Sequence, residues 1–131
     1  MTSNIKQVLV VDDQNNWRKA LRILLENEGY RVSDASNSQN AKELIRSSDF
    51  GLAILDVRLI DDETLNMEGL DLLDFIKKES PVTKTIVLTG YPEGIGNTKP
   101  DNADDLILKI PGKSTFDIKG FQEKVKNLLN N

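Results

Sequence analysis

The sequence contains neither cysteine nor histidine. Without cysteine the chain has no disulfide, no thiolate nucleophile and no cysteine-ligated zinc, which suits a cytoplasmic protein. Without histidine it has no Ser-His-Asp triad, no histidine-ligated metal and no phosphohistidine of its own. A nucleophile in this chain is therefore a carboxylate, a hydroxyl or an amine.

Long apolar runs and an excess of positive charge are also missing. The apolar runs are too short to span a membrane, and the first residues lack the apolar stretch of a signal peptide. The chain has 17 lysines and arginines against 21 acidic residues, a net charge of −4 that gives no reason to expect a nucleic-acid partner. A length of 131 residues fits one domain, so we expect a single domain over residues 1–131 with no effector domain attached.

Short apolar runs predict the strands of a buried sheet. Four of them are continuous rather than alternating, as in parallel strands that are covered on both faces: residues 8–11, 52–55, 86–88 and 106–108. A fifth segment, 31–35, alternates and is more polar, which predicts an edge strand.

Helical patterns separate these strands. Trp17, Leu21 and Leu24 share one face of a helix predicted over 15–27, and Gly29 is a plausible helix stop. Further helices are predicted over about 38–47 and about 68–79. A last helix, marked by Ile118, Phe121, Val125 and Leu128, is predicted to run almost to the C-terminus.

The stretch 90–105 is poorly suited to a helix. It holds three glycines, two prolines and two asparagines but few apolar residues. Glycine and proline cost about 1 and 3 kcal/mol in a helix interior. We therefore expect the helix between the fourth and fifth strands to be short, displaced or missing.

The alternation of strands and helices predicts an α/β fold. Right-handed crossovers give a flavodoxin-like, doubly wound sheet of five parallel strands in the order 2-1-3-4-5, with helices on both faces. The ligand site of such a sheet lies beyond the carboxyl ends of the strands. The side chains expected there are Asp12, Asp13, Asp56, Thr89 and Lys109, which follow four of the apolar runs.

Three carboxylates, one hydroxyl and one amine suit phosphoryl transfer. Two carboxylates about 4 Å apart repel by about 4 kcal/mol at an effective dielectric constant near 20, so the cluster requires a cation or a shared proton. Few carboxylates, with waters and a phosphate oxygen, describe a Mg²⁺ site. Asp56 would attack a phosphoryl donor and form an acyl phosphate, while Lys109 neutralises the phosphoryl group and Thr89 donates a hydrogen bond to it.

These residues, in this order, resemble a response regulator receiver domain of two-component signal transduction, similar to the chemotaxis regulators. The resemblance covers about residues 5–129. It implies that Asp56 is the phosphoacceptor, that Asp12 and Asp13 form an acid pocket, and that Mg²⁺ binds this pocket with Asp56 and the backbone carbonyl of Arg58. It also implies that a histidine kinase or phosphotransfer protein is the donor and that phosphorylation switches the regulation of a downstream partner. Chemistry of this kind is self-catalysed phosphorylation and autodephosphorylation rather than conventional enzymatic turnover.

The chain departs from the receiver pattern on the loop after Asp56. Ile60 stands where receivers usually have proline, and the matching glycine is Gly69, which implies an insertion over 58–68. This insertion is either an acidic loop that selects partners or a solvated segment without a role.

Other departures surround Lys109. Leu106 replaces the usual aromatic residue unless Tyr91 takes its place, and Ile110 separates the lysine from the proline that usually follows it. Either the bond before Ile110 is cis, at about 2.5–4 kcal/mol, or Lys109 is positioned by a different backbone route. Arg58 and Tyr91 also stand where receivers tune phosphoryl lifetime. Either these bulky side chains slow autodephosphorylation, or both point to solvent and have no such role.

Alternative functions use the same fold. One is a degenerate receiver that acts as a protein-interaction adaptor without phosphoryl turnover. Another is a small enzyme or flavin carrier, which the acidic site disfavours because flavin phosphate prefers backbone donors. The segment 112–115 reads Gly-Lys-Ser-Thr, but Ile107 occupies the first glycine position of a P-loop, so capping of the last helix by Ser114 or Thr115 is the better interpretation.

Overall fold

The computed structural model describes residues 6–56, 67–89, 102–109 and 116–130, without the side chains of residues 67–70 and 89. The described strands and helices follow one another along the chain in this order: β1 (Gln7–Val11), α1 (Asn15–Asn27), β2 (Arg31–Ala35), α2 (Ser38–Ser47), β3 (Leu52–Asp56), α3 (Met67–Glu79), β4 (Lys84–Thr89), β5 (Asp105–Leu108) and α5 (Ile118–Leu129). No helix in these ranges is long and apolar enough to cross a membrane.

The five strands form one parallel sheet in the order β2-β1-β3-β4-β5. This confirms the predicted doubly wound topology. The more polar β2 lies at one edge of the sheet, as its alternating sequence predicted.

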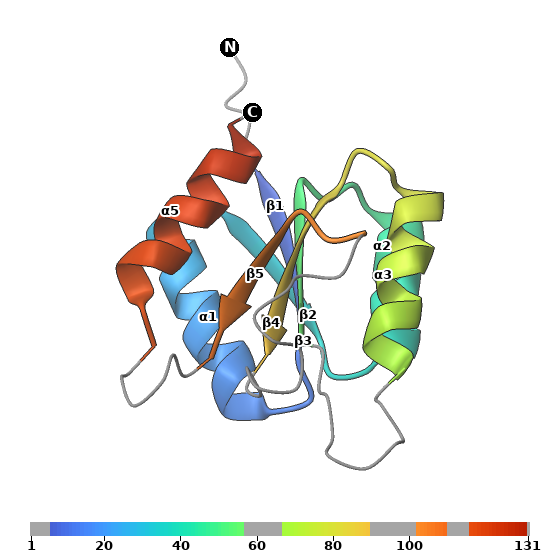
Figure 1. Cartoon of the computed structure of the whole chain (residues 1–131), viewed down its shortest axis with the longest axis horizontal. Helices are drawn as coiled ribbons and strands as arrows, with labels where there is room; N and C mark the ends of the chain where they lie inside the picture. The colour runs from blue at the N-terminus through green and yellow to red at the C-terminus, as the bar shows by residue number, and fades with distance from the viewer. Residues whose placement is uncertain (1–5, 57–66, 90–101, 110–115, 131) are drawn as a thin grey trace.

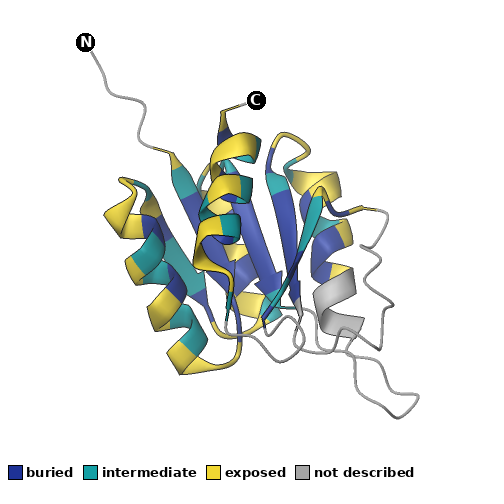
Figure 2. Ribbon diagram, turned by 60° about the vertical axis from the view of Figure 1, so that its left-hand side comes forward, coloured by how far each residue is buried: buried dark blue, intermediate teal, exposed yellow. Residues whose placement is uncertain are grey.

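Helices cover both faces of the sheet: α1 and α5 lie on one side, and α2 and α3 on the other (Figure 1). Successive strand residues point to opposite faces, so Val8 and Val10 pack in the core under α1 and α5, whereas Leu9 and Val11 pack under α2 and α3. Figure 2 shows the buried residues concentrated in the strands and on the inward faces of the helices. Covering on both faces explains why the strand sequences are continuously apolar.

The helix ends follow from local sequence. The predicted ranges 15–27 and 38–47 match α1 and α2, and α3 begins one residue earlier than expected. The glycine after α1, Gly29, has a φ of +93°, and its N–H donates to the Glu26 carbonyl at 3.0 Å. A side chain at Gly29 would strain this backbone, which makes glycine the suitable residue.

The predicted cap of the last helix is wrong. Instead of Ser114 or Thr115, the cap is Asp117, whose carboxylate accepts a hydrogen bond from the Gly120 N–H at 2.9 Å. The helix begins at Ile118, so Asp117 stands in the N-cap position, from which a side-chain oxygen reaches the free N–H groups of the first turn.

The expected irregularity of the fourth helix falls mostly on residues 90–101, which lie outside the described residues, and it stays a prediction. The described residues 102–104 precede β5, and a hydrogen bond joins this segment to β4. The Asp104 carboxylate accepts a hydrogen bond from the Thr85 N–H at 2.8 Å.

Candidate functional site

The strand register brings the carboxyl ends of β1, β3, β4 and β5 to one level of the sheet. Val11 pairs with Leu55, so Asp12 and Asp56 come next on neighbouring strands. Asp56 itself pairs with Leu88, one residue before Thr89. Thr89 pairs with Leu108, and Lys109 follows directly. The parallel sheet therefore collects these residues at its carboxyl edge.

Three carboxylates form a cluster at this edge. Asp12, Asp13 and Asp56 each offer an oxygen, and these oxygens all lie within 4.8 Å of one another. Asp12 is buried, Asp56 is half-buried and Asp13 is exposed. The cluster is therefore open to solvent on the side of Asp13 and closed on the side of Asp12.

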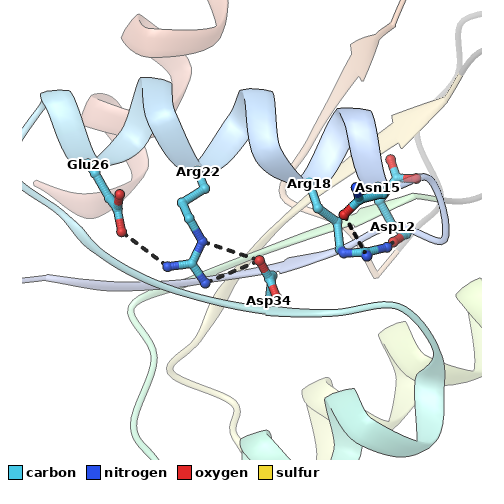
Figure 3. A network of polar contacts seen from close by, with 6 residues as sticks. All are labelled: Asp12, Asn15, Arg18, Arg22, Glu26 and Asp34. Atoms are coloured by element: carbon cyan, nitrogen blue, oxygen red, sulfur yellow. Dashed lines mark hydrogen bonds and ion pairs between the residues drawn. The ribbon is translucent and has the colours of Figure 1, made fainter.

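Backbone and side-chain contacts fix Asp12. Its N–H donates to the Ala35 carbonyl at 3.1 Å, and its Oδ1 accepts from the Gln14 N–H at 2.9 Å. Its carbonyl accepts from Arg18 Nη1 at 2.8 Å, and the same guanidinium reaches Asn15 Oδ1 at 3.1 Å, as Figure 3 shows. The Oδ1 of Asp12 is thus bonded to the backbone at the start of α1, and its Oδ2 faces the Lys109 ammonium.

The Lys109 ammonium lies among these carboxylates. Its Nζ is 2.9 Å from Asp12 Oδ2 and 3.5 Å from Asp56 Oδ1, and its side chain is only 7% exposed. It also donates to Gln14 Oε1 at 3.0 Å and lies 4.9 Å from the centre of the Trp17 ring. The ammonium is therefore held from two sides.

The cluster fits a divalent cation. Asp12 Oδ2 is buried and, among the described residues, has no aligned hydrogen-bond donor; its contact with Lys109 is an ion pair only. The Lys109 ammonium pairs with two of these carboxylates, Asp12 and Asp56. Carboxylate oxygens are the donor set that Mg²⁺ takes, completed by waters.

Several predicted site residues cannot be placed in this geometry. Thr89 ends β4, but its side chain lies outside the described residues. Arg58, Tyr91, most of the insertion over 58–68 and the bond from Lys109 to Ile110 also lie outside them. The roles expected of these residues stay predictions.

Gln14 is a site residue that the sequence interpretation missed. Its only signal is its place, directly after the acidic pair and at the N-cap of α1. Trp17, which the sequence placed on the apolar face of the first helix, is half-buried and also faces the site ammonium.

A second polar network continues along α1 (Figure 3). Arg22 forms ion pairs with Glu26 and with Asp34 of β2, both at 3.1 Å. Burial lowers the pKa of Arg22, but the hydrogen bonds and charges of Asp34 and Glu26 outweigh it and leave the pKa raised. This network ties α1 to the edge strand of the sheet.

Comparison with protein families matches residues 8–115 to the response regulator receiver domain. Among curated proteins, the alginate biosynthesis transcriptional regulatory protein AlgB of Pseudomonas aeruginosa is 34% identical over 92 residues, which are 69% of this chain and 19% of that protein. This chain thus spans about a fifth of the length of AlgB.

Solved structures agree with this match. The response regulator TrrA of Thermotoga maritima, in complex with Mg²⁺-BeF, is 31% identical with a TM-score of 0.77, over 95% of this chain and 99% of that one. TrrA in complex with the histidine kinase ThkA is 30% identical with a TM-score of 0.72, over 95% of this chain and 99% of that one.

Proposed function

Because the chain belongs to the response regulator receiver domain family, we propose that it accepts a phosphoryl group on Asp56 and acts as a switch in a two-component phosphorelay. The observation that carries this proposal is the cluster of three carboxylates with a buried ammonium at the carboxyl edge of the sheet. Asp56 lies at the end of β3 in this cluster, next to the exposed Asp13, and a donor would approach it from that side.

The proposed reaction is a displacement at phosphorus. A carboxylate oxygen of Asp56 forms a bond to phosphorus, and the bond from phosphorus to the leaving group breaks. The leaving group is a histidine nitrogen of a kinase or phosphotransfer protein, or the acetate of acetyl phosphate. The product is an acyl phosphate on Asp56.

Lys109 is proposed to neutralise charge on the transferred group. Its Nζ already lies 3.5 Å from Asp56 Oδ1, so a small shift brings it to a phosphoryl oxygen. Thr89 is proposed to donate a hydrogen bond to another oxygen of the group. Both contributions are positioning and charge stabilisation, which is what phosphoryl transfer requires.

Mg²⁺ is the proposed cofactor. Asp12, Asp13, Asp56 and the backbone carbonyl of Arg58 would hold it, directly or through water. When bound, Mg²⁺ supplies positive charge that offsets the repulsion between the carboxylates and an anionic donor. The three carboxylate oxygens, which lie within 4.8 Å of one another, support this assignment.

The proposed partners follow from the comparisons. TrrA is described in complex with a histidine kinase and AlgB as a transcriptional regulator. By that likeness we propose a histidine kinase or phosphotransfer protein as donor and a downstream protein or effector domain as target. We further propose that residues 1–131 form a single receiver domain that works in the cytoplasm and binds neither nucleic acid nor membrane itself.

Intact-mass measurement tests the function. The protein is incubated with acetyl phosphate and Mg²⁺, beside a metal-free sample and an Asp56→Asn variant. We expect one phosphoryl adduct on the wild type with Mg²⁺ and none in either control. If neither acetyl phosphate nor a histidine kinase gave an adduct, the phosphoacceptor function would be wrong and the adaptor function would replace it.

A further inference from the structure

We propose that Trp17 and Gln14 are positioning residues that together hold the Lys109 ammonium at the acid cluster. Gln14 is the N-cap residue of α1 and Trp17 lies in its first turn, and both contact the ammonium. The consequence for phosphorylation rests on the proposed function; the contact itself does not.

The need for such positioning arises from the lysine side chain. Lysine is a point charge on a flexible four-carbon stem, so its backbone position alone does not fix its ammonium. Here Lys109 follows a strand of only four residues at the edge of the sheet. Its ammonium is nevertheless almost fully withdrawn from solvent. Contacts with other side chains must therefore hold it.

Gln14 and Trp17 provide these contacts without adding charge. Gln14 Oε1 accepts a hydrogen bond from Nζ at 3.0 Å, and the Trp17 ring lies 4.9 Å from Nζ, within cation–π range. Acidic side chains in their place would add repulsion to a site that already has three carboxylates. Neutral contacts instead leave the whole positive charge of Lys109 for the carboxylates and an incoming phosphoryl group.

A chain of aromatic rings fixes Trp17 in turn. Its ring meets Phe116 edge-on, with centroids 5.3 Å apart and planes at 79°. Phe116 packs against Phe121 of α5 at 5.5 Å, and Phe121 is 1% exposed. Edge-to-face pairs of this kind are a favourable geometry. The indole is thus anchored in the hydrophobic core while one face remains on the ammonium.

The surroundings of Trp17 supply a matched control. Trp17 also lines an apolar groove of about 600 Å³ between α1 and α5, together with Phe116 and Ile23. Ile23 is 58% exposed, lies more than one helical turn beyond Trp17 on α1, and has neither a polar group nor a ring to offer an ammonium. Ile23→Ala therefore removes apolar surface from the same groove without touching the ammonium.

Nuclear magnetic resonance on the unphosphorylated, metal-free protein tests the contact. The ring current of Trp17 should shift the Cε protons of Lys109 upfield. We expect Trp17→Leu to remove this shift, Ile23→Ala to keep it, and Gln14→Ala to move the ammonium resonance. A Lys109 shift unchanged by Trp17→Leu would overturn the proposal, whatever the phosphorylation results.

A double-mutant cycle tests the positioning role. The rate of Asp56 labelling by acetyl phosphate with Mg²⁺ should fall about threefold to tenfold in Trp17→Leu, the size expected from a lost cation–π contact. Trp17→Phe should recover part of the rate because it keeps an aromatic face. In a Lys109→Ala background, Trp17→Leu should have no further effect.

The outcomes separate the two proposals. An equal slowing by Trp17→Leu with and without Lys109 would mean that Trp17 acts through packing, and the positioning role would be wrong. A wild type that takes up no phosphoryl group from any donor would refute the proposed function instead. In that case the Lys109 proton shifts still decide whether Trp17 holds the ammonium.

Discussion

The Lys109 ammonium lies 2.9 Å from the Oδ2 of Asp12, and their side chains are 7% and 0% exposed. Asp12 follows β1 and Lys109 follows β5, so this buried ion pair joins the ends of two strands that are not neighbours in the sheet. The same pair places the positive charge of Lys109 next to Asp56. Folding and the proposed chemistry thus depend on one contact.

Removal of the ammonium should destabilise the metal-free protein. Lys109→Met leaves the buried Asp12 without its counter-charge, and breaking one side of a buried pair costs about 3–5 kcal/mol. Urea unfolding in a chelating buffer measures this loss. Mg²⁺ should recover more stability in the variant than in the wild type, because the freed carboxylates gain a cation.

The matched control is Lys124→Met. Its ion pair with Asp105 has side chains that are 43% and 31% exposed, so its loss should change the free energy of unfolding by less than about 1 kcal/mol. Equal losses in the two variants would contradict a special role of the Lys109 pair in the fold.

Mg²⁺ binding should change the fluorescence of Trp17. Trp17 is the only tryptophan of the chain and lies 4.9 Å from the Lys109 ammonium, so a cation at the cluster alters the field around the indole. Asp13→Asn should lower the affinity for Mg²⁺ at least about tenfold, because changes to residues that only support metal ligands already lower metal affinity by about 10–100-fold. Glu43→Gln, on exposed α2 surface, is the control that should leave the titration unchanged.

Gly29→Ala should lower the free energy of unfolding by about 1 kcal/mol. The φ of Gly29 is +93°, and an added Cβ would meet nothing within 4 Å, so the cost comes from the backbone alone. Gly29→Asn should cost less, because asparagine tolerates this region better. Thermal unfolding measures the stability of the two variants. An alanine variant as stable as the wild type would contradict the view that the positive φ of Gly29 favours glycine at the end of α1.

The Arg22 network should contribute little to stability. Arg22 is 36% exposed in its side chain and pairs with Asp34 and Glu26, so Arg22→Ala should lower the free energy of unfolding by about 1 kcal/mol or less. This loss should shrink at high salt because screening weakens exposed pairs. A loss that does not respond to salt would mean that the arginine stem contributes through packing instead.

Much of the fold could be predicted because strand burial follows from local sequence and the place of the residues after each strand follows from the topology of a parallel sheet. Continuous apolar runs predict covered strands, and a parallel sheet brings the residues after them to one edge, which is why Asp12, Asp13 and Asp56 were expected together. The same logic could not find Gln14, because its contact with Lys109 is made by side chains from opposite ends of the chain.

The cap of α5 shows a second limit. Ser114, Thr115 and Asp117 are all good cap residues by type, and the sequence pattern does not fix the first helical residue to within three positions. Only the backbone geometry, with the Gly120 N–H directed at Asp117, selects among them.

The position of the phosphoryl bond decides whether Asp56 is the phosphoacceptor. Freshly phosphorylated protein is reduced with borohydride, which converts an aspartyl phosphate to homoserine, and peptide sequencing by mass spectrometry locates the product. We predict homoserine at position 56 alone, in samples that received both acetyl phosphate and Mg²⁺. Homoserine at Asp12 or Asp13, or a phosphoryl group that survives reduction on a serine or threonine, would contradict Asp56 as the phosphoacceptor.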